Sequence, residues 1–128
     1  MKYAVIDIGS NSVRLMINVD GQTLYKLVET TRLAEGMGSE KLLKAQAVDR
    51  TVSAVSFFVK KAKEERANKV YVFGTAAVRN AVNCHQFTKA IKDATGQDVD
   101  VISGEMEALI GRIGAIGQSL VSVFNILL

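Results

Sequence analysis

The alternation of apolar and polar positions at the start of the chain predicts three strands. Two apolar runs, residues 2–8 and 13–19, are separated by a short stretch of small polar residues. A third run, residues 22–32, alternates apolar and polar positions, which is typical of an edge strand with one buried face. Asp20 and Gly21 lie between the second and third runs, and this dipeptide between alternating apolar residues indicates a type I′ hairpin.

The rest of the chain alternates between helical and strand patterns. Between residues 44 and 67, valines and alanines recur every three or four positions, which predicts one long amphipathic helix. Residues 70–74 form a continuous apolar run, as in a central strand that is buried on both faces. Four more elements are expected after this strand. Thr75 would cap a short helix, and Asn83 would cap a second helix that runs to about Thr95 and ends at Gly96. A strand over 98–102 and a last helix that Ser103 caps would follow.

This order of elements, βββαβαβα, predicts an α/β fold. The first three strands would form an antiparallel meander on one side of a mixed sheet, and the later units would place helices on both faces. The layout is that of a ribonuclease H-like sheet. In such a sheet, a ligand can meet the protein at the loops that follow the carboxyl ends of the strands.

The composition is that of one globular domain. With 128 residues, of which 48% are hydrophobic and 23% charged, the chain can bury a packed core. A net charge of +3 that is spread along the chain argues against a dedicated nucleic-acid binder. The longest apolar run, residues 120–128, is far shorter than the ~20 residues that span a bilayer, and the start lacks the pattern of a signal peptide. We therefore expect a cytoplasmic protein that contacts neither membranes nor nucleic acid.

The single cysteine and the single histidine limit the chemistry further. One cysteine, Cys84, excludes an internal disulfide, and one histidine, His85, leaves no zinc-ligand set. The two are adjacent, and neighbours on a helix point about 100° apart. One buried and one exposed side chain is therefore a better interpretation than a nucleophile with its base.

The polar stretch between the first two strands is a candidate phosphate-binding turn. Its sequence is Gly9-Ser10-Asn11-Ser12, in which Gly9 permits a positive φ and the small residues let a phosphate approach the backbone. Asp7 stands at the mouth of the turn, where its carboxylate can hold a cation or a water. An ordinary Asx-type turn is the alternative interpretation.

Three more segments offer candidate site residues. Arg32 ends the third strand and enters a glycine loop, although a solvated arginine explains it as well. Thr75 and Arg79 follow the buried strand at a helix start, which favours anions, although a cap and a surface arginine are an equal alternative. Glu107 lies in the first turn of the last helix, as a general base or as a partner of the helix dipole. All these segments lie where one cleft could gather them.

Together the segments resemble the exopolyphosphatase and guanosine pentaphosphate phosphohydrolase family, which has the actin-like and sugar-kinase-like ATPase fold. The resemblance covers residues 3 to about 117, and several spaced motifs in the same order are far more specific than one. They are Asp7-Ile8-Gly9-Ser10-Asn11-Ser12-Val13-Arg14-Leu15, Arg32-Leu33-Ala34-Glu35-Gly36, Gly74-Thr75-Ala76-Ala77-Val78-Arg79-Asn80-Ala81 and Val101-Ile102-Ser103-Gly104-Glu105-Met106-Glu107-Ala108.

The resemblance implies Mg²⁺-dependent hydrolysis of a terminal phosphate from inorganic polyphosphate, or of the 5′-γ-phosphate of guanosine pentaphosphate. A positioned water would attack in line while Mg²⁺ and arginines carry the charge of the phosphoryl oxygens. The resemblance also implies a role for each motif. Phosphate would be bound by Gly9, Ser10, Asn11, Ser12 and Thr75, and clamped by Arg32 and Arg79. Asp7 would anchor a metal ion or a water, and Glu107 would be the catalytic glutamate, with Glu105 a second acid of lower rank.

The chain departs from this family after residue 117. A second glycine-rich phosphate loop that begins with an acid should follow, but residues 118–128 form an apolar tail instead. We therefore expect residues 1–117 to be the N-terminal domain, without the second loop and second domain, and with little or no activity alone.

Two alternatives to the enzyme domain stay open. One is a non-catalytic phosphate- or nucleotide-binding module, and the other is an inactive truncated fragment whose apolar tail drives homo-oligomer formation. The choice between polyphosphate and guanosine pentaphosphate also stays open, because selectivity should reside largely in the absent lobe.

Overall fold

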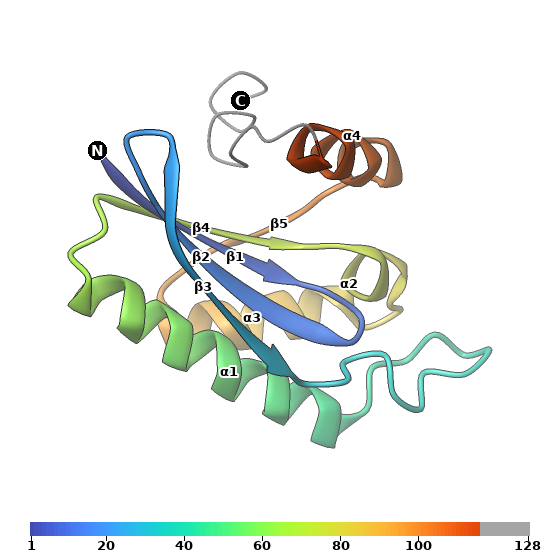
Figure 1. Cartoon of the computed structure of the whole chain (residues 1–128). Coiled ribbons are helices and arrows are strands. Elements are labelled where there is room, and N and C mark those ends of the chain that lie inside the picture. The colour runs from blue at the N-terminus through green and yellow to red at the C-terminus, as the bar shows by residue number, and fades with distance from the viewer. Residues whose placement is uncertain (116–128) are drawn as a thin grey trace.

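The computed structural model describes residues 1–115 as one five-stranded sheet with four helices (Figure 1). The strands lie in the order β3-β2-β1-β4-β5. Strands β1, β2 and β3 pair antiparallel, whereas β4 and β5 run parallel to β1, so the sheet is mixed. The elements are β1 (Lys2–Ile8), β2 (Ser12–Val19), β3 (Gln22–Thr30), α1 (Ala45–Glu64), β4 (Lys69–Gly74), α2 (Ala76–Asn80), α3 (Cys84–Thr95), β5 (Val99–Val101) and α4 (Gly104–Ala115).

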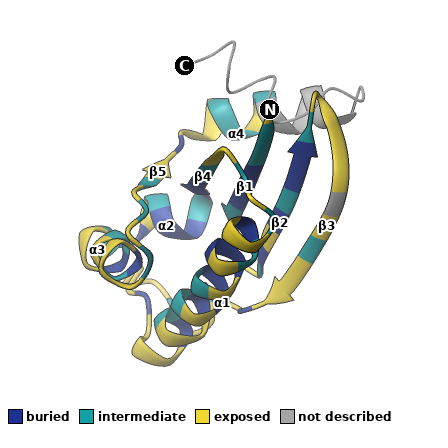
Figure 2. Ribbon diagram, turned by 90° about the vertical axis from the view of Figure 1, so that its left-hand side faces the viewer, coloured by how far each residue is buried: buried dark blue, intermediate teal, exposed yellow. Residues whose placement is uncertain are grey.

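Helices cover both faces of the sheet, which confirms the predicted α/β layout. Helices α1 and α3 pack on one face and present their buried sides to it, and α4 lies over the opposite face, called here the α4 face (Figures 1 and 2). The larger core includes Ile6, Ile8, Leu15, Val55, Phe58, Phe87 and Ile91. The smaller one consists of Val5, Phe73 and Ile102, with Met106 of α4 packed against it.

Strand β4 is buried on both faces, as its apolar run predicted. Val72 belongs to the core under α1 and α3, and Phe73 to the core under α4. Strand β3 is the predicted edge strand, and the hairpin before it has φ values of 51° at Asp20 and 85° at Gly21, as a type I′ turn requires. Leu24 on this edge strand stays exposed.

Several elements end earlier than the sequence predicted. Strand β3 ends at Thr30 because the chain turns at Arg32, whose φ is 50°. Strand β5 is shorter at both ends than the predicted 98–102. Between β4 and β5 the chain forms two helices, the short α2 and then α3, at the places that the caps indicated.

Helix α1 ends at Glu64 rather than near residue 67. The N–H of Arg66 donates to Lys63 O and that of Ala67 to Ala62 O, both at 3.0 Å, which is the pattern of a Schellman motif. Arg66 takes the left-handed conformation that this motif requires, with φ at 59°.

Two of the predicted caps are confirmed. Gly96 ends α3 in the left-handed conformation, with φ at 75°. The Ser103 hydroxyl accepts a hydrogen bond from the Met106 N–H at 3.0 Å and so caps α4.

The other two predicted caps are wrong, since Thr75 and Asn83 make no side-chain cap hydrogen bond within the described chain. The Thr75 hydroxyl donates to Ile8 O at 3.4 Å. The Asn83 amide instead accepts from Leu43 N–H and donates to Leu43 O, both at 3.0 Å. Contacts with distant backbone therefore take both side chains away from their own helices.

The remaining sequence predictions concern single residues and the end of the chain. Cys84 is half-buried and His85 exposed, close to the predicted division. Within residues 1–115, none of the helices is both long and apolar enough to span a membrane. The predicted apolar tail, residues 118–128, lies outside the described residues.

Candidate active site

The four candidate segments meet at one edge of the sheet. Strands β1, β3, β4 and β5 all point the same way, so their carboxyl ends share an edge (Figure 1). The turn after β1, the loop after β3, helix α2 after β4 and helix α4 after β5 therefore start from this edge. The predicted gathering of these segments is confirmed, and the roles of their side chains stay predictions.

The turn after β1 is tight because the Gly9 N–H donates to Ser12 O at 3.0 Å. Gly9 does not use the positive φ that glycine permits, since it is not among the residues with positive φ in the described chain. Glycine is needed for space instead: a Cβ added at Gly9 would lie 3.0 Å from Ser12 O. The small residue here serves close backbone approach.

The loop after β3 holds this turn by donating hydrogen bonds to the carbonyl groups of the turn. Thr31 and Arg32 both donate their N–H groups to Asn11 O, at 3.1 and 2.9 Å, and Ala34 donates to Ser10 O at 3.0 Å. In a planar trans peptide the C=O and the N–H point in opposite directions. The N–H groups of Asn11 and Ser12 are thus turned away from this loop, as an anion-binding turn would need.

Asp7 lies beside this turn on the α4 face, between Arg14 of β2 and Phe73 of β4 in the sheet register. Burial raises the pKa of its carboxyl to about 6, the Arg14 charge acts to lower it, and the Glu107 charge raises it further. Its Oδ1 is buried and has no hydrogen-bond partner within the described residues. The Asp7 carboxylate therefore has one oxygen that is left without a partner and could accept a proton or a cation.

Arg79 and Glu107 are brought together from different helices. The Arg79 Nη1 donates to Ile102 O at 2.9 Å and to Glu107 Oε2 at 3.2 Å. Both side chains are partly exposed, at 28% and 41%. The nearby Glu105 is exposed. The structure thus pairs the predicted phosphate clamp with the predicted catalytic acid.

Thr75 occupies a different position from the other candidates. It is buried, its N–H donates to Ile8 O at 3.2 Å, and its hydroxyl donates to the same oxygen. Gly74 just before it is packed closely, since an added Cβ would lie 2.9 Å from Val78. These contacts fasten the start of α2 to β1, and a phosphate contact of Thr75 stays a prediction.

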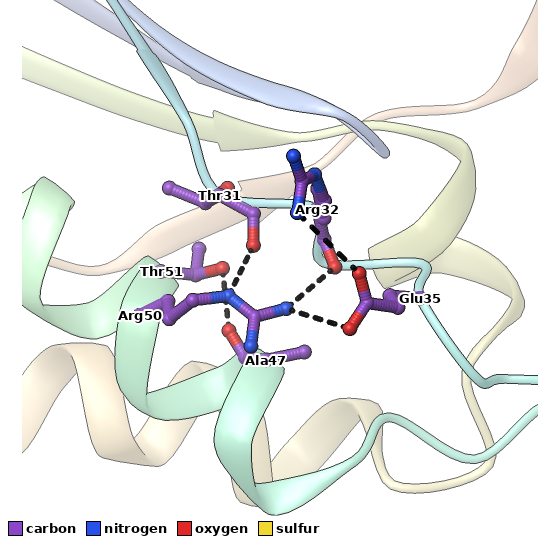
Figure 3. Close-up of polar contacts among 6 residues, drawn as sticks. All are labelled: Thr31, Arg32, Glu35, Ala47, Arg50 and Thr51. Atoms are coloured by element: carbon purple, nitrogen blue, oxygen red, sulfur yellow. Dashed lines mark hydrogen bonds and ion pairs between the residues drawn. The ribbon is translucent and has the colours of Figure 1, made fainter.

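The Arg32 side chain belongs to a second polar group, separate from the pair of Arg79. Arg32 is 66% exposed and lies 4.0 Å from Glu35, which in turn lies 3.6 Å from Arg50 of α1 (Figure 3). Arg50 also reaches the backbone of the loop after β3. Sequence reasoning missed Arg50, because the pattern of α1 marks it only as a polar position.

A pocket of about 180 Å³ opens beside Asp7 on the sheet. It combines one carboxylate with two cationic side chains over an apolar floor. Its lining residues are Val5, Asp7, Arg14, Leu15, Met16, Lys26 and Val28. A small molecule therefore has space to bind next to Asp7, the candidate ligand for a cation.

Known proteins are similar in sequence to this chain over most of its length. The model of the Ppx/GppA phosphatase family matches residues 5–128. A guanosine-5′-triphosphate,3′-diphosphate pyrophosphatase from Photobacterium profundum is 43% identical over 112 residues, which are 84% of this chain and 22% of that relative. The protein of the same description from Vibrio cholerae is 36% identical over 110 residues, which are 83% of this chain and 22% of that relative.

Solved structures share the fold. An exopolyphosphatase from Cytophaga hutchinsonii superposes with a TM-score of 0.81 at 28% identity, over 86% of this chain and 36% of that one. The Aquifex aeolicus PPX-GPPA enzyme superposes with a TM-score of 0.77 at 32% identity, over 84% of this chain and 37% of that one. A ROK hexokinase from Thermus thermophilus, with a TM-score of 0.51 and 17% identity, shares the fold alone.

The chain is therefore similar to one part of longer proteins. It spans 22% of the length of the curated relatives described above, and the match covers the N-terminal domain of the family. The sequence match, the shared fold and the gathering of four motifs at one sheet edge agree: the chain belongs to the Ppx/GppA phosphatase family.

Proposed function

We propose that this chain is the phosphate-binding N-terminal domain of an enzyme that releases the terminal phosphate of inorganic polyphosphate or guanosine pentaphosphate. The observation that carries the proposal is the contact between Arg79 and Glu107, which lie 3.2 Å apart. Of these two residues, Glu107 is close enough to Asp7 for its charge to raise the pKa of the Asp7 carboxyl. A cationic clamp, an acid and a cation ligand at one sheet edge are the groups that phosphoryl transfer to water requires. Membership of a phosphatase family supports the same reaction class.

We also propose the domain organisation that the sequence indicated: residues 1–117 as the N-terminal domain, and a second domain that provides the other wall of the cleft in the longer relatives. The strand order β3-β2-β1-β4-β5, with its antiparallel meander beside parallel strands, supports a ribonuclease H-like sheet. A cytoplasmic location is part of the same proposal.

The residues of this chain would act in the following way. The backbone of Gly9-Ser10-Asn11-Ser12 would bind phosphate oxygens through N–H groups that face away from the loop after β3. Arg79 would bind the terminal phosphate with its forked guanidinium. Because the phosphate competes with Glu107 for Arg79, binding would free the Glu107 carboxylate to orient a water and accept its proton.

Mg²⁺ fits one position at this edge. Within residues 1–115, groups of three or more His, Cys, Asp or Glu that could hold a metal are absent. Mg²⁺ is often bound through one or two carboxylates together with substrate phosphates and waters, so the unpartnered Oδ1 of Asp7 suffices as a protein ligand. When bound, the ion would neutralise charge on the phosphate oxygens.

A phosphate-binding module without turnover is the second candidate function. The ion pair between Arg79 and Glu107 favours it, because a Glu107 carboxylate that is held by Arg79 is not free to accept a proton from water. We expect the chain alone to bind phosphates and to turn them over slowly or not at all.

Phosphate release from polyphosphate and from guanosine pentaphosphate, with Mg²⁺, separates the two functions. Any release should disappear in Glu107→Gln, and the matched variant Glu105→Gln, an exposed acid in the same helical turn, should behave as the unchanged chain. Saturable binding without release supports the module. If the chain neither binds these phosphates nor hydrolyses them, the proposed function is refuted.

A further inference from the structure

Arg50 of α1 is positioned to hold the phosphate-binding turn although it lies outside every candidate motif. Its Nε donates to Thr31 O at 2.9 Å and its Nη2 to Arg32 O at 3.4 Å (Figure 3). The same Nη2 also lies 3.6 Å from a carboxylate oxygen of Glu35. One side chain thus binds two successive carbonyl groups at the end of β3.

These two carbonyl groups flank a strained residue. Arg32 has a φ of 50°, a left-handed conformation that residues with a Cβ rarely adopt. Such a conformation persists only where the surroundings determine it. Arg50 binds the carbonyl before Arg32 and the carbonyl of Arg32 itself, so the rigid guanidinium fork fixes the backbone on both sides of this φ angle.

The orientation of this backbone is passed on to the turn after β1. The Thr31 carbonyl that Arg50 binds and the Arg32 N–H belong to one planar peptide, so they point in opposite directions. That N–H donates to Asn11 O at 2.9 Å. The Asn11 carbonyl in turn shares its peptide with the Ser12 N–H, which is therefore directed away from Arg50, toward the candidate anion site.

From this chain of contacts we propose that Arg50 is a positioning residue for phosphate binding: its guanidinium orders and polarises the peptides of Arg32 and Ser12 that lead to the candidate phosphate site. A cation at one end of aligned peptide dipoles strengthens each hydrogen bond along the line. The inference rests on the proposed function, since it assigns Arg50 to the site that would bind phosphate.

The test uses the 128-residue chain with three variants. Arg50→Lys keeps the charge but replaces the planar fork with a point charge, and Arg50→Met removes the charge. Lys60→Met, at an exposed position of the same helix, removes one charge without touching the loop. Two quantities are measured: hydrogen exchange of the Thr31 and Arg32 amides, and the dissociation constant for inorganic pyrophosphate with Mg²⁺.

We expect both Arg50 variants to accelerate exchange of these two amides and to weaken pyrophosphate binding by about tenfold, the effect of about one hydrogen bond to a charged group. Exchange at the buried Ile6 amide should stay unchanged, since a general loss of stability would accelerate it too. Lys60→Met should leave both quantities unchanged.

The inference is overturned if Arg50→Lys exchanges and binds like the unchanged chain, or if Lys60→Met weakens binding as much as Arg50→Met. If the unchanged chain does not bind pyrophosphate, the proposed function fails and with it the role in binding. The exchange rates of Thr31 and Arg32 then still decide whether Arg50 holds the loop.

Discussion

At the scale of single residues, the charged side chains at the carboxyl ends of the strands differ in whether an opposite charge or a hydrogen bond neutralises them. Arg79 and Glu107 neutralise each other across 3.2 Å. Asp7 is half-buried, and desolvation raises its pKa to about 6 even though Arg14 beside it acts in the opposite direction. Its Oδ1 is left without a hydrogen bond to any described residue. The raised pKa means that the Asp7 carboxylate changes its charge near pH 6 rather than near its usual value of 3.8.

Asp7→Asn should stabilise the chain at neutral pH in the absence of divalent cations. Because the folded-state pKa is raised from 3.8 to about 6, the folded chain loses stability as pH rises through that range. Removing the buried charge should therefore increase the free energy of unfolding at pH 7.5 by at most about 3 kcal/mol, with little gain near pH 4. Urea unfolding at both pH values measures this, and an equal effect at both would exclude a titrating Asp7 as the cause.

Asn18 is a second residue whose buried polar atoms lack partners. It is fully buried on β2, and neither atom of its side-chain amide has a hydrogen-bond partner in the described part of the chain. Asn18→Leu should raise the free energy of unfolding by about 1–2 kcal/mol, because the desolvation cost disappears. Thermal unfolding measures the change.

The matched control is Asn83→Leu, the same substitution at an amide whose two atoms are bonded to Leu43. It should lower the free energy of unfolding by about 2 kcal/mol. If Asn18→Leu destabilises as Asn83→Leu does, the Asn18 amide stabilises the fold and its burial carries no net desolvation cost.

At the scale of elements, the site depends on how closely helices and loops approach the strand ends. The first helix after β4 can start at once because Gly74 leaves space for Val78, which is fully buried. Thr75 then ties the same helix start to Ile8 O. The position of Arg79, one turn further on, follows from this packing.

Gly74→Ala should therefore displace α2, because the added Cβ would lie 2.9 Å from two carbon atoms of the Val78 side chain. We expect a loss of about 1–3 kcal/mol in the free energy of unfolding. Gly104→Ala is the control at the start of α4, where the nearest atom would be Arg79 Nη2 at 3.8 Å, and helix propensity should make it neutral or stabilising by up to about 1 kcal/mol. Equal losses in urea unfolding for both variants would contradict this packing argument.

The elements that could be predicted from the sequence depend on local contacts. The hairpin at Asp20 and Gly21 and the caps at Gly96 and Ser103 are decided within a few residues, and all were correct. Thr75 and Asn83 failed as caps because their partners, Ile8 and Leu43, are 67 and 40 positions away along the chain. Local sequence cannot say which distant carbonyl will compete for a side chain.

At the scale of the whole molecule, the topology explains why motifs far apart in the sequence form one candidate site. Strands β1, β4 and β5 are parallel, so Asp7 near the end of β1, Arg79 in the helix after β4 and Glu107 in the helix after β5 lie at the same edge of the sheet. This could be predicted from the order of the elements. The contact of Arg50 with the carbonyls of Thr31 and Arg32 could not, because it involves backbone atoms that no side-chain pattern records.

The chain spans 22% of the length of the two curated relatives described above. We propose that the carboxyl-terminal edge of its sheet is one wall of a larger cleft in such longer proteins. We propose that this wall by itself binds phosphate through Arg79 and the turn after β1. Binding of tripolyphosphate with Mg²⁺, followed by calorimetry and by the amide resonances of the chain, is the measurement that decides this. Arg79→Met removes the clamp, and Lys89→Met removes an exposed cation that is also paired with a carboxylate.

We predict saturable binding to the unchanged chain, with the largest resonance shifts at Asn11 and Ser12. Arg79→Met should weaken binding at least about tenfold, and Lys89→Met should leave it unchanged. Absence of saturable binding to the unchanged chain, or equal weakening by both variants, would show that Arg79 and the turn after β1 do not form a phosphate site.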